Sequence, residues 1–138
     1  MSAQAAPSKK PYLQMSLLYQ GLALDELGQP IYLGIFNQIA GDLPLQVLFV
    51  VSNQYTNGFG MHRQYTQVLD PDGTLMAQSD ESQFLLQNVI GGQRIDERFG
   101  VQFSKEGRHT VRVFLNDQMV IEHFFMVRPR RMPPTPEA

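Results

Sequence analysis

Apolar and polar residues alternate most clearly in the segment from Gly107 to Val127, GRHTVRVFLNDQMVIEHFFMV. Two runs rich in β-branched and aromatic residues flank a short polar stretch at Asn116, Asp117 and Gln118. This pattern is typical of a β-hairpin. We therefore expect two antiparallel strands here.

The side chains also predict the register of this hairpin. A three-residue loop at 116–118 makes one face mainly apolar and places Arg112 opposite Glu122 on the other face. The other opposed pairs in that register are Leu115 and Met119, Phe114 and Val120, Val113 and Ile121, and Val111 and His123. A two-residue turn at Asn116 and Asp117, which tolerate positive φ, would instead mix charged and apolar residues on both faces. We expect the longer loop.

The remaining apolar runs are equally short and are separated by turn residues. Leu45–Val51 is almost continuously apolar, which favours a central strand buried on both sides. Asp70–Gly73 reads Asp-Pro-Asp-Gly and predicts a tight connection, because Pro fixes φ and Gly accepts a positive φ. The other expected strands begin within 13–24 and cover 31–36, 61–69, 74–78, 84–90 and 94–103.

Gly91 and Gly92 are expected to form a type I′ turn that joins 84–90 to 94–103 as a second hairpin. The apolar residues of 94–103 share one parity, which predicts one packed and one solvent-facing side. They are Ile95, Phe99, Val101 and Phe103. Glu97 interrupts this pattern and is expected near a bulge or the rim of the sheet.

The count reaches about eight or nine short strands, with no longer segment of helical periodicity, and indicates an all-β, antiparallel β-sandwich. A chain of 138 residues suits one domain. We expect that domain to span 12–127. Residues 1–11 are expected to be a flexible N-terminal segment and 128–138 a basic, proline-rich tail, both disordered.

The order of these segments resembles a family of small uncharacterised bacterial proteins with an immunoglobulin-like β-sandwich. The resemblance covers 12–127 and includes Leu33–Ile35, Pro44, the Asp70–Gly73 turn and the Gly107 hairpin. At Asn116 and Asp117 similar proteins more often carry Asp-Gly. The resemblance implies the immunoglobulin-like fold and a bacterial origin, and it brings no active site.

The charge distribution bears on the class of partner. Between Tyr12 and Val127 there are six basic and 12 acidic residues, which gives this part of the chain a formal charge of about −6. A nucleic-acid surface needs clustered Lys and Arg to neutralise phosphates. We therefore expect no nucleic-acid partner.

The chain contains no cysteine, so it has no disulfide, thiolate metal site or cysteine nucleophile. Its first 15 residues lack the apolar core of a secretory signal, and no apolar run approaches the roughly 20 residues of a membrane span. These features predict a cytoplasmic protein without a membrane partner.

Three histidines, His62, His109 and His123, are the weak candidates for a metal site, because neutral imidazole is a common ligand. The predicted hairpin places His109 and His123 diagonally on one face of neighbouring strands. Loop carboxylates are candidates for calcium if they converge at one end of the sandwich. They are Asp25, Glu26, Asp42, Asp70 and Asp72.

No catalytic motif is present, and we expect no cofactor. Ser79–Ser82 is expected to be a polar loop. Arg130, Pro133 and Pro136 match a proline-rich docking pattern, and Tyr55, Phe59 and Tyr65 are candidate ring faces for a sugar. The sequence favours a non-enzymatic interaction module or assembly subunit, whose partner is either another protein or a second copy joined through an edge strand. The alternative is a metal- or ligand-binding protein, or a hydrolytic enzyme that uses loop His and Asp residues.

Overall fold

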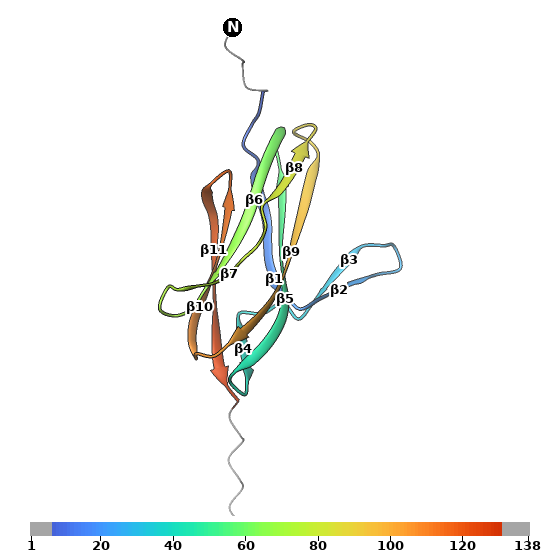
Figure 1. The fold of residues 1–138 in the computed structure, drawn as a ribbon. Coiled ribbons are helices and arrows are strands. Elements are labelled where there is room, and N and C mark those ends of the chain that lie inside the picture. Colours follow the sequence, from blue (N-terminus) through green and yellow to red (C-terminus); the bar gives the residue numbers. More distant parts are fainter. Residues whose placement is uncertain (1–6, 131–138) are drawn as a thin grey trace, which may run out of the picture.

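The computed structural model describes residues 7–130, and this part of the chain is all-β (Figure 1). It contains 11 strands. They are β1 (Tyr12–Tyr19), β2 (Gly21–Leu24), β3 (Pro30–Leu33), β4 (Gln38–Gly41), β5 (Leu45–Thr56), β6 (Gly60–Leu69), β7 (Leu75–Gln78), β8 (Ser82–Leu86), β9 (Gly92–Phe103), β10 (Gly107–Leu115) and β11 (Gln118–Pro129). Among these residues no helix has the length and apolar character needed to cross a bilayer.

The strands form two main sheets and a separate two-stranded arm. One sheet has three antiparallel strands in the order β1-β5-β9. The other has the order β4-β11-β10-β6, with β7 and β8 both paired to β6, and it is mixed because β4 runs parallel to β11. The arm consists of β2 and β3, which pair only with each other and project sideways from the body in Figure 1.

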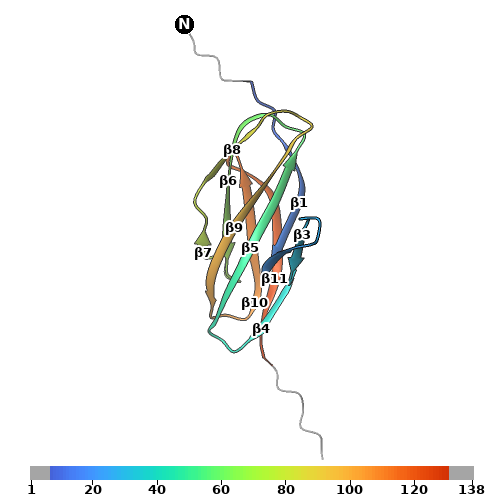
Figure 2. The same ribbon diagram turned by 90° about the vertical axis from the view of Figure 1, so that its right-hand side faces the viewer.

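The core lies between the two sheets, and Figure 2 looks onto the three-stranded sheet, with β10 and β11 of the other sheet behind it. Alternate residues of each strand point inward, as period-2 patterning requires. Phe49 and Phe99 of the three-stranded sheet stack with ring centroids 5.4 Å apart. Phe125 of the six-stranded sheet packs edge-on against Phe103 at 5.7 Å. The buried cluster continues through Val47, Val51, Val68, Val101, Val111, Val113 and Val127.

The 107–127 hairpin is confirmed, and so is its register around Arg112 and Glu122, which form an ion pair at 2.7 Å. The three-residue loop is wrong. Asn116 and Asp117 form a two-residue turn with φ of 50° and 66°, and a bulge at Val120 restores the predicted facing further along. The bulge allows the short turn and the predicted facing of Arg112 and Glu122 to occur together.

The side chain of Asn116 makes contacts of its own. Its side-chain oxygen accepts the Arg63 amide at 3.1 Å, and its side-chain nitrogen lies 3.0 Å from Nδ1 of His62. The turn is thereby attached to β6.

The second predicted hairpin, at Gly91 and Gly92, is wrong. β8 pairs with β6 and β9 pairs with β5, so the 87–91 segment crosses from one sheet to the other. Neither glycine has a positive φ. The side chain of Asn88 forms this turn by accepting the amides of Ile90 and Gly91 at 3.1 and 2.7 Å.

β5 is the central strand of its sheet, as predicted, but only its second half is covered on both sides. Val51, Ser52 and Asn53 are fully buried, whereas Leu48 is 72% exposed. β1 pairs with β5 only as far as Val50, and Leu48 lies beyond the end of that pairing. The Asp70–Gly73 connection is confirmed, with Gly73 at φ 82°.

The predicted terminal segments are described only in part. Residues 1–6 and 131–138 lie outside the described residues. Within the first segment, Lys9 pairs through its backbone with Phe59, and Pro11 is buried against Gly58.

Two neighbouring phenylalanines on β11 test this arrangement. Phe125→Ala is expected to lower the free energy of unfolding by about 3–5 kcal/mol, because it opens a cavity between the sheets. Phe124 is 46% exposed on the opposite face, and Arg108 lies 4.4 Å from its ring centroid. Phe124→Ala should cost about 1 kcal/mol or less. Urea unfolding with an unchanged m-value measures both, and equal losses would contradict the two-sheet core.

Candidate binding surface

The arm is a hairpin formed by a short turn with its own hydrogen bonds. Oδ1 of Asp25 accepts the amides of Leu27 at 2.9 Å and Gln29 at 2.8 Å. Gly28 has φ 78°, in the region that only glycine adopts without strain. Asp25 and Gly28 thus form a reversal that pairs β2 with β3.

The root of the arm is fixed to the three-stranded sheet by Tyr32. Its ring meets that of Tyr19 edge-on at 4.9 Å, and Nη1 of Arg94 lies 3.4 Å from its hydroxyl. Beneath it, the hydroxyls of Tyr19 and Ser52 are 2.6 Å apart, and Ser52 donates to Asp96 at 2.5 Å.

This network has a defined direction. Because the only proton of the Ser52 hydroxyl goes to Asp96, Tyr19 donates to Ser52. Burial, the largest influence, raises the pKa of Tyr19 and keeps that proton in place. Arg94 lies 3.3 Å from Asp96 and balances its charge. The arm therefore leaves the sheet from a buried, hydrogen-bonded base.

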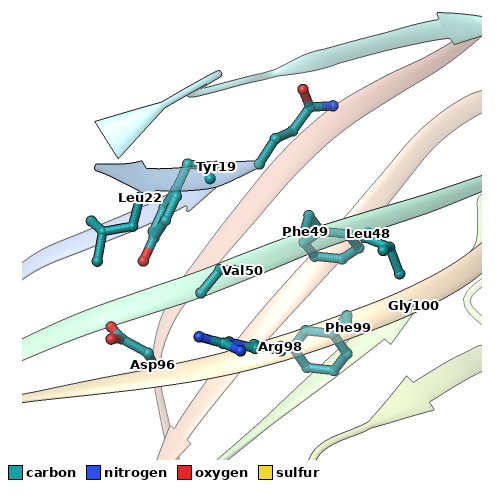
Figure 3. A pocket seen from close by; sticks show the side chains of 11 residues that line it. Tyr19, Leu22, Leu48, Phe49, Val50, Asp96, Arg98, Phe99 and Gly100 are labelled. Atoms are coloured by element: carbon teal, nitrogen blue, oxygen red, sulfur yellow. The ribbon is translucent and has the colours of Figure 1, made fainter. Parts of the chain in front are cut away.

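A groove of about 430 Å³ lies between the root of the arm and the outer face of the sheet. Figure 3 shows Leu22 of the arm above it and Leu48, Val50 and Arg98 across its floor. A Cβ added to Gly100 would come within 3.0 Å of the Leu48 side chain, so glycine at this position leaves space for Leu48. The groove has apolar walls and one cationic group, Arg98.

The arm exposes apolar side chains on both of its faces. Leu27 at the turn is 86% exposed, and Leu24 and Leu33 are 66% and 50% exposed. The other exposed apolar residues of this region are Leu22, Ile31 and Ile35. Contiguous apolar surface of this kind marks interaction sites, whereas single exposed leucines do not. The arm and the adjoining groove together form the candidate surface.

Glu97 occupies a second notable position: it lies on β9, an edge strand of its sheet, but the predicted bulge is absent. The β5–β9 register runs without a bulge, and Glu97 continues the inward parity of Phe99 with 5% exposure. Its Oε1 accepts from Thr66 at 2.9 Å and from the side chain of Gln64, which in turn accepts from Tyr55 at 2.6 Å. Its Oε2 is buried without a partner.

Burial raises the pKa of Glu97, and its polar neighbours Ser79, Thr66 and Gln64 oppose that rise. Burial is also the main cause that raises the pKa of Tyr55, with the Glu97 charge second. A groove of about 380 Å³ lies beside Glu97, lined by Ser79, Asp80 and Asp96 among others. Glu97 lies on β9 and Gln64 and Thr66 lie on β6, so these hydrogen bonds link the two sheets.

Ser16 and His123 form the one serine–histidine contact within the described residues. The Ser16 hydroxyl lies 2.5 Å from Oδ1 of Asn53 and 2.6 Å from Nε2 of His123. Burial lowers the pKa of His123, which favours the neutral ring. With Asn53 accepting the serine proton, His123 donates to Ser16, the reverse of the direction that activates a nucleophile. The trio links β1 and β5 to β11.

The three histidines are separate. Although His109 and His123 share one face as predicted, His109 donates through Nδ1 to Gly107 at 3.1 Å and stacks on Phe125 at 5.5 Å. His62 lies 2.9 Å from the Phe59 carbonyl. Within residues 7–130 no group of three His, Cys, Asp or Glu side chains is placed to hold a metal ion.

The remaining candidates also have individual contacts. Asp70 and Asp72 both bind Lys105, at 3.0 and 2.6 Å, while Asp25 caps the turn of the arm. Tyr55 is fully buried, and Tyr65 stacks on Phe114 at 4.8 Å. Phe59 and Asp42 line neither groove described above, and Glu26 lies at the turn of the arm. Pro133 and Pro136 lie outside the described residues.

Sequence reasoning missed both the arm and the groove. The sequence does carry a signal for the arm. Its two strands have only four residues each, and five apolar residues lie in or beside the turn that joins them: Leu22, Leu24, Leu27, Ile31 and Leu33. Short strands that are apolar on both sides have no sheet to cover them.

No known protein family and no curated protein matches this sequence. Among solved structures, a Pseudomonas fluorescens alkylpurine DNA glycosylase AlkC bound to DNA with an abasic site analog is similar over 82% of this chain and 30% of its own, with 14% identity and a TM-score of 0.42. A Listeria innocua β-glucosidase in complex with isofagomine is similar over 85% and 16%, with 11% identity and a TM-score of 0.48. The chain thus spans less than a third of either enzyme, and the likeness transfers neither activity.

The buried carboxyl of Glu97 predicts a pH-dependent stability. Because its pKa in the folded protein lies above the ordinary value of 4.5, the unfolded chain releases this proton first as pH rises. Protonated Glu97 therefore contributes to the free energy of unfolding at pH values below 4.5, and this contribution is lost as the pH rises through the pKa of Glu97 in the folded protein. Glu97→Gln should remove this loss, so its stability relative to the native protein should increase with pH.

Denaturant unfolding at several pH values from 4 to 8 measures the difference. Glu106→Gln serves as the control for the loss of one carboxyl, because Glu106 is exposed in the β9–β10 connection. A Glu97→Gln difference that stays constant across the range would contradict the buried placement.

Proposed function

We propose that this protein is a non-enzymatic, immunoglobulin-like β-sandwich of the bacterial family that its sequence resembles, and that it acts as a protein-interaction module or assembly subunit. The arm and the groove beside it form the binding surface. A partner polypeptide packs against the exposed leucines of the arm and enters the groove over Leu48.

The observation that carries this proposal is the combination of a rigid base with an uncovered apolar extension. A two-stranded hairpin on its own is marginally stable in water. Here Tyr32, Tyr19 and Ser52 hold its root, while its tip and both faces remain exposed. Burial of about 25 cal/mol per Å² of apolar surface by a partner favours association.

The surrounding charge favours a protein partner over nucleic acid. Residues 12–127 carry six basic and 12 acidic groups, and four of the basic ones are already in ion pairs, namely Arg63, Arg94, Lys105 and Arg112. We retain the cytoplasmic location expected from the cysteine-free sequence.

The alternative of a metal- or ligand-binding protein or a hydrolase receives less support from the geometry. His62, His109 and His123 each have separate contacts, and the loop carboxylates Asp70 and Asp72 share one lysine. Ser16 receives a hydrogen bond from His123 instead of giving one.

Site-specific photo-crosslinking tests the proposal in cells that naturally make the protein. Benzoylphenylalanine in place of Leu48 should give light-dependent adducts with one or a few polypeptides, because this position lies on the floor of the groove. The matched control is Met61, which is 58% exposed on the outer face of the six-stranded sheet. Equal adducts from both positions, or none from position 48, would overturn the proposal.

A further inference from the structure

The candidate surface carries a projection and a recess side by side. The projection is the arm, with Leu24 and Leu27 at its far end, and the recess is the groove between its root and the sheet. A twofold interface requires a surface that is complementary to itself, since the same patch appears on both partners. Two copies placed face to face bring each arm to the groove of the other.

The charges of the two parts are also complementary. Asp25 and Glu26 lie at the turn of the arm. Asp25 already accepts two backbone amides, whereas Glu26 has no hydrogen bond or ion pair among the described residues. Arg98 lies in the groove and likewise has no ion pair within residues 7–130.

This match is specific to the arm and the groove. With twice as many acidic as basic residues in 12–127, an arbitrary contact between two copies is repulsive. The other groove-lining charge, Asp96, is held by Ser52 and Arg94. Arg98 is therefore the group in the groove that attracts an acidic tip.

We propose that the partner is a second copy of this chain. Resting on the proposed function of the surface, this inference adds the occupant: the arm of each copy places Leu24 and Leu27 over Leu48 of the other, and Glu26 lies beside Arg98. Each chain contributes one arm and one groove, so the dimer contains two equivalent contacts and leaves neither part free for a third copy.

Sedimentation equilibrium of the full chain tests this at low salt. The native protein should form a dimer whose fraction rises with concentration. Glu26→Arg and Arg98→Glu should each weaken the dimer by about tenfold, because each makes both contacts repulsive. Neither residue is buried, so both variants should fold like the native protein. Glu106→Arg changes the net charge by the same amount as Glu26→Arg and should leave the dimer unchanged.

Mixing the two single variants is the decisive step. In the mixed dimer one contact is the native Glu26 and Arg98, and the other joins the arginine introduced at position 26 to the glutamate introduced at position 98. Both are attractive, so mixing E26R with R98E should restore native affinity. A third variant, Leu27→Asp, should abolish the dimer.

The outcomes separate this inference from the proposed function. A protein that stays monomeric at about millimolar concentration, while Leu48 crosslinks to a different polypeptide, overturns the second copy and keeps the interaction surface. A protein that stays monomeric and gives no crosslink from position 48 overturns both the second copy and the interaction surface. A dimer that ignores E26R and R98E, or that mixing fails to restore, uses another interface and also overturns the inference.

Discussion

Apolar side chains at alternate positions of both sheets pack against one another, and the other features of the molecule are arranged around that contact. Phe49 and Phe99 come from one sheet and Phe103 and Phe125 meet across the interface. Each strand therefore sends one set of side chains inward and leaves the other set outside. The outward set of the three-stranded sheet includes Leu48, which is 72% exposed and lies in the groove beside the arm.

Polar groups between the sheets restrict how the two layers fit. Glu97 accepts from Gln64 and Thr66 across the interface, and Ser16 joins Asn53 to His123 in the same way. Buried polar groups are costly unless they are hydrogen-bonded, so a shifted register would leave several of them unpaired. These contacts hold the three-stranded sheet in place. On its outer face, the hydrogen bonds of Ser52 with Tyr19 and Asp96 fix the base from which the arm extends.

Local patterns in the sequence predicted the turns and hairpins that depend on neighbouring residues. The pairing of strands that are distant in sequence was visible only in the structure. Alternation located the 107–127 hairpin, and Asp-Pro-Asp-Gly located a tight turn. The Gly91–Gly92 hairpin failed because β8 finds a better partner in β6, which no local signal encodes. A related reason applies to Glu97. Its charge suggested a bulge or the rim, but its side chain points inward because Gln64 and Thr66 of β6 donate hydrogen bonds to it, and no local pattern shows that these strands meet. β4 was missed because its four residues gain their pairing only from β11.

Amide hydrogen exchange of the arm at low and high protein concentration tests the central claim, that the arm is completed by the groove of a second chain. Isolated hairpins open easily, and their amides then exchange with little protection. The account predicts fast exchange in Gly21–Leu33 in dilute solution, strong protection of the same amides in concentrated solution, and no change in β5. Protection of the arm that is the same at both concentrations would contradict it.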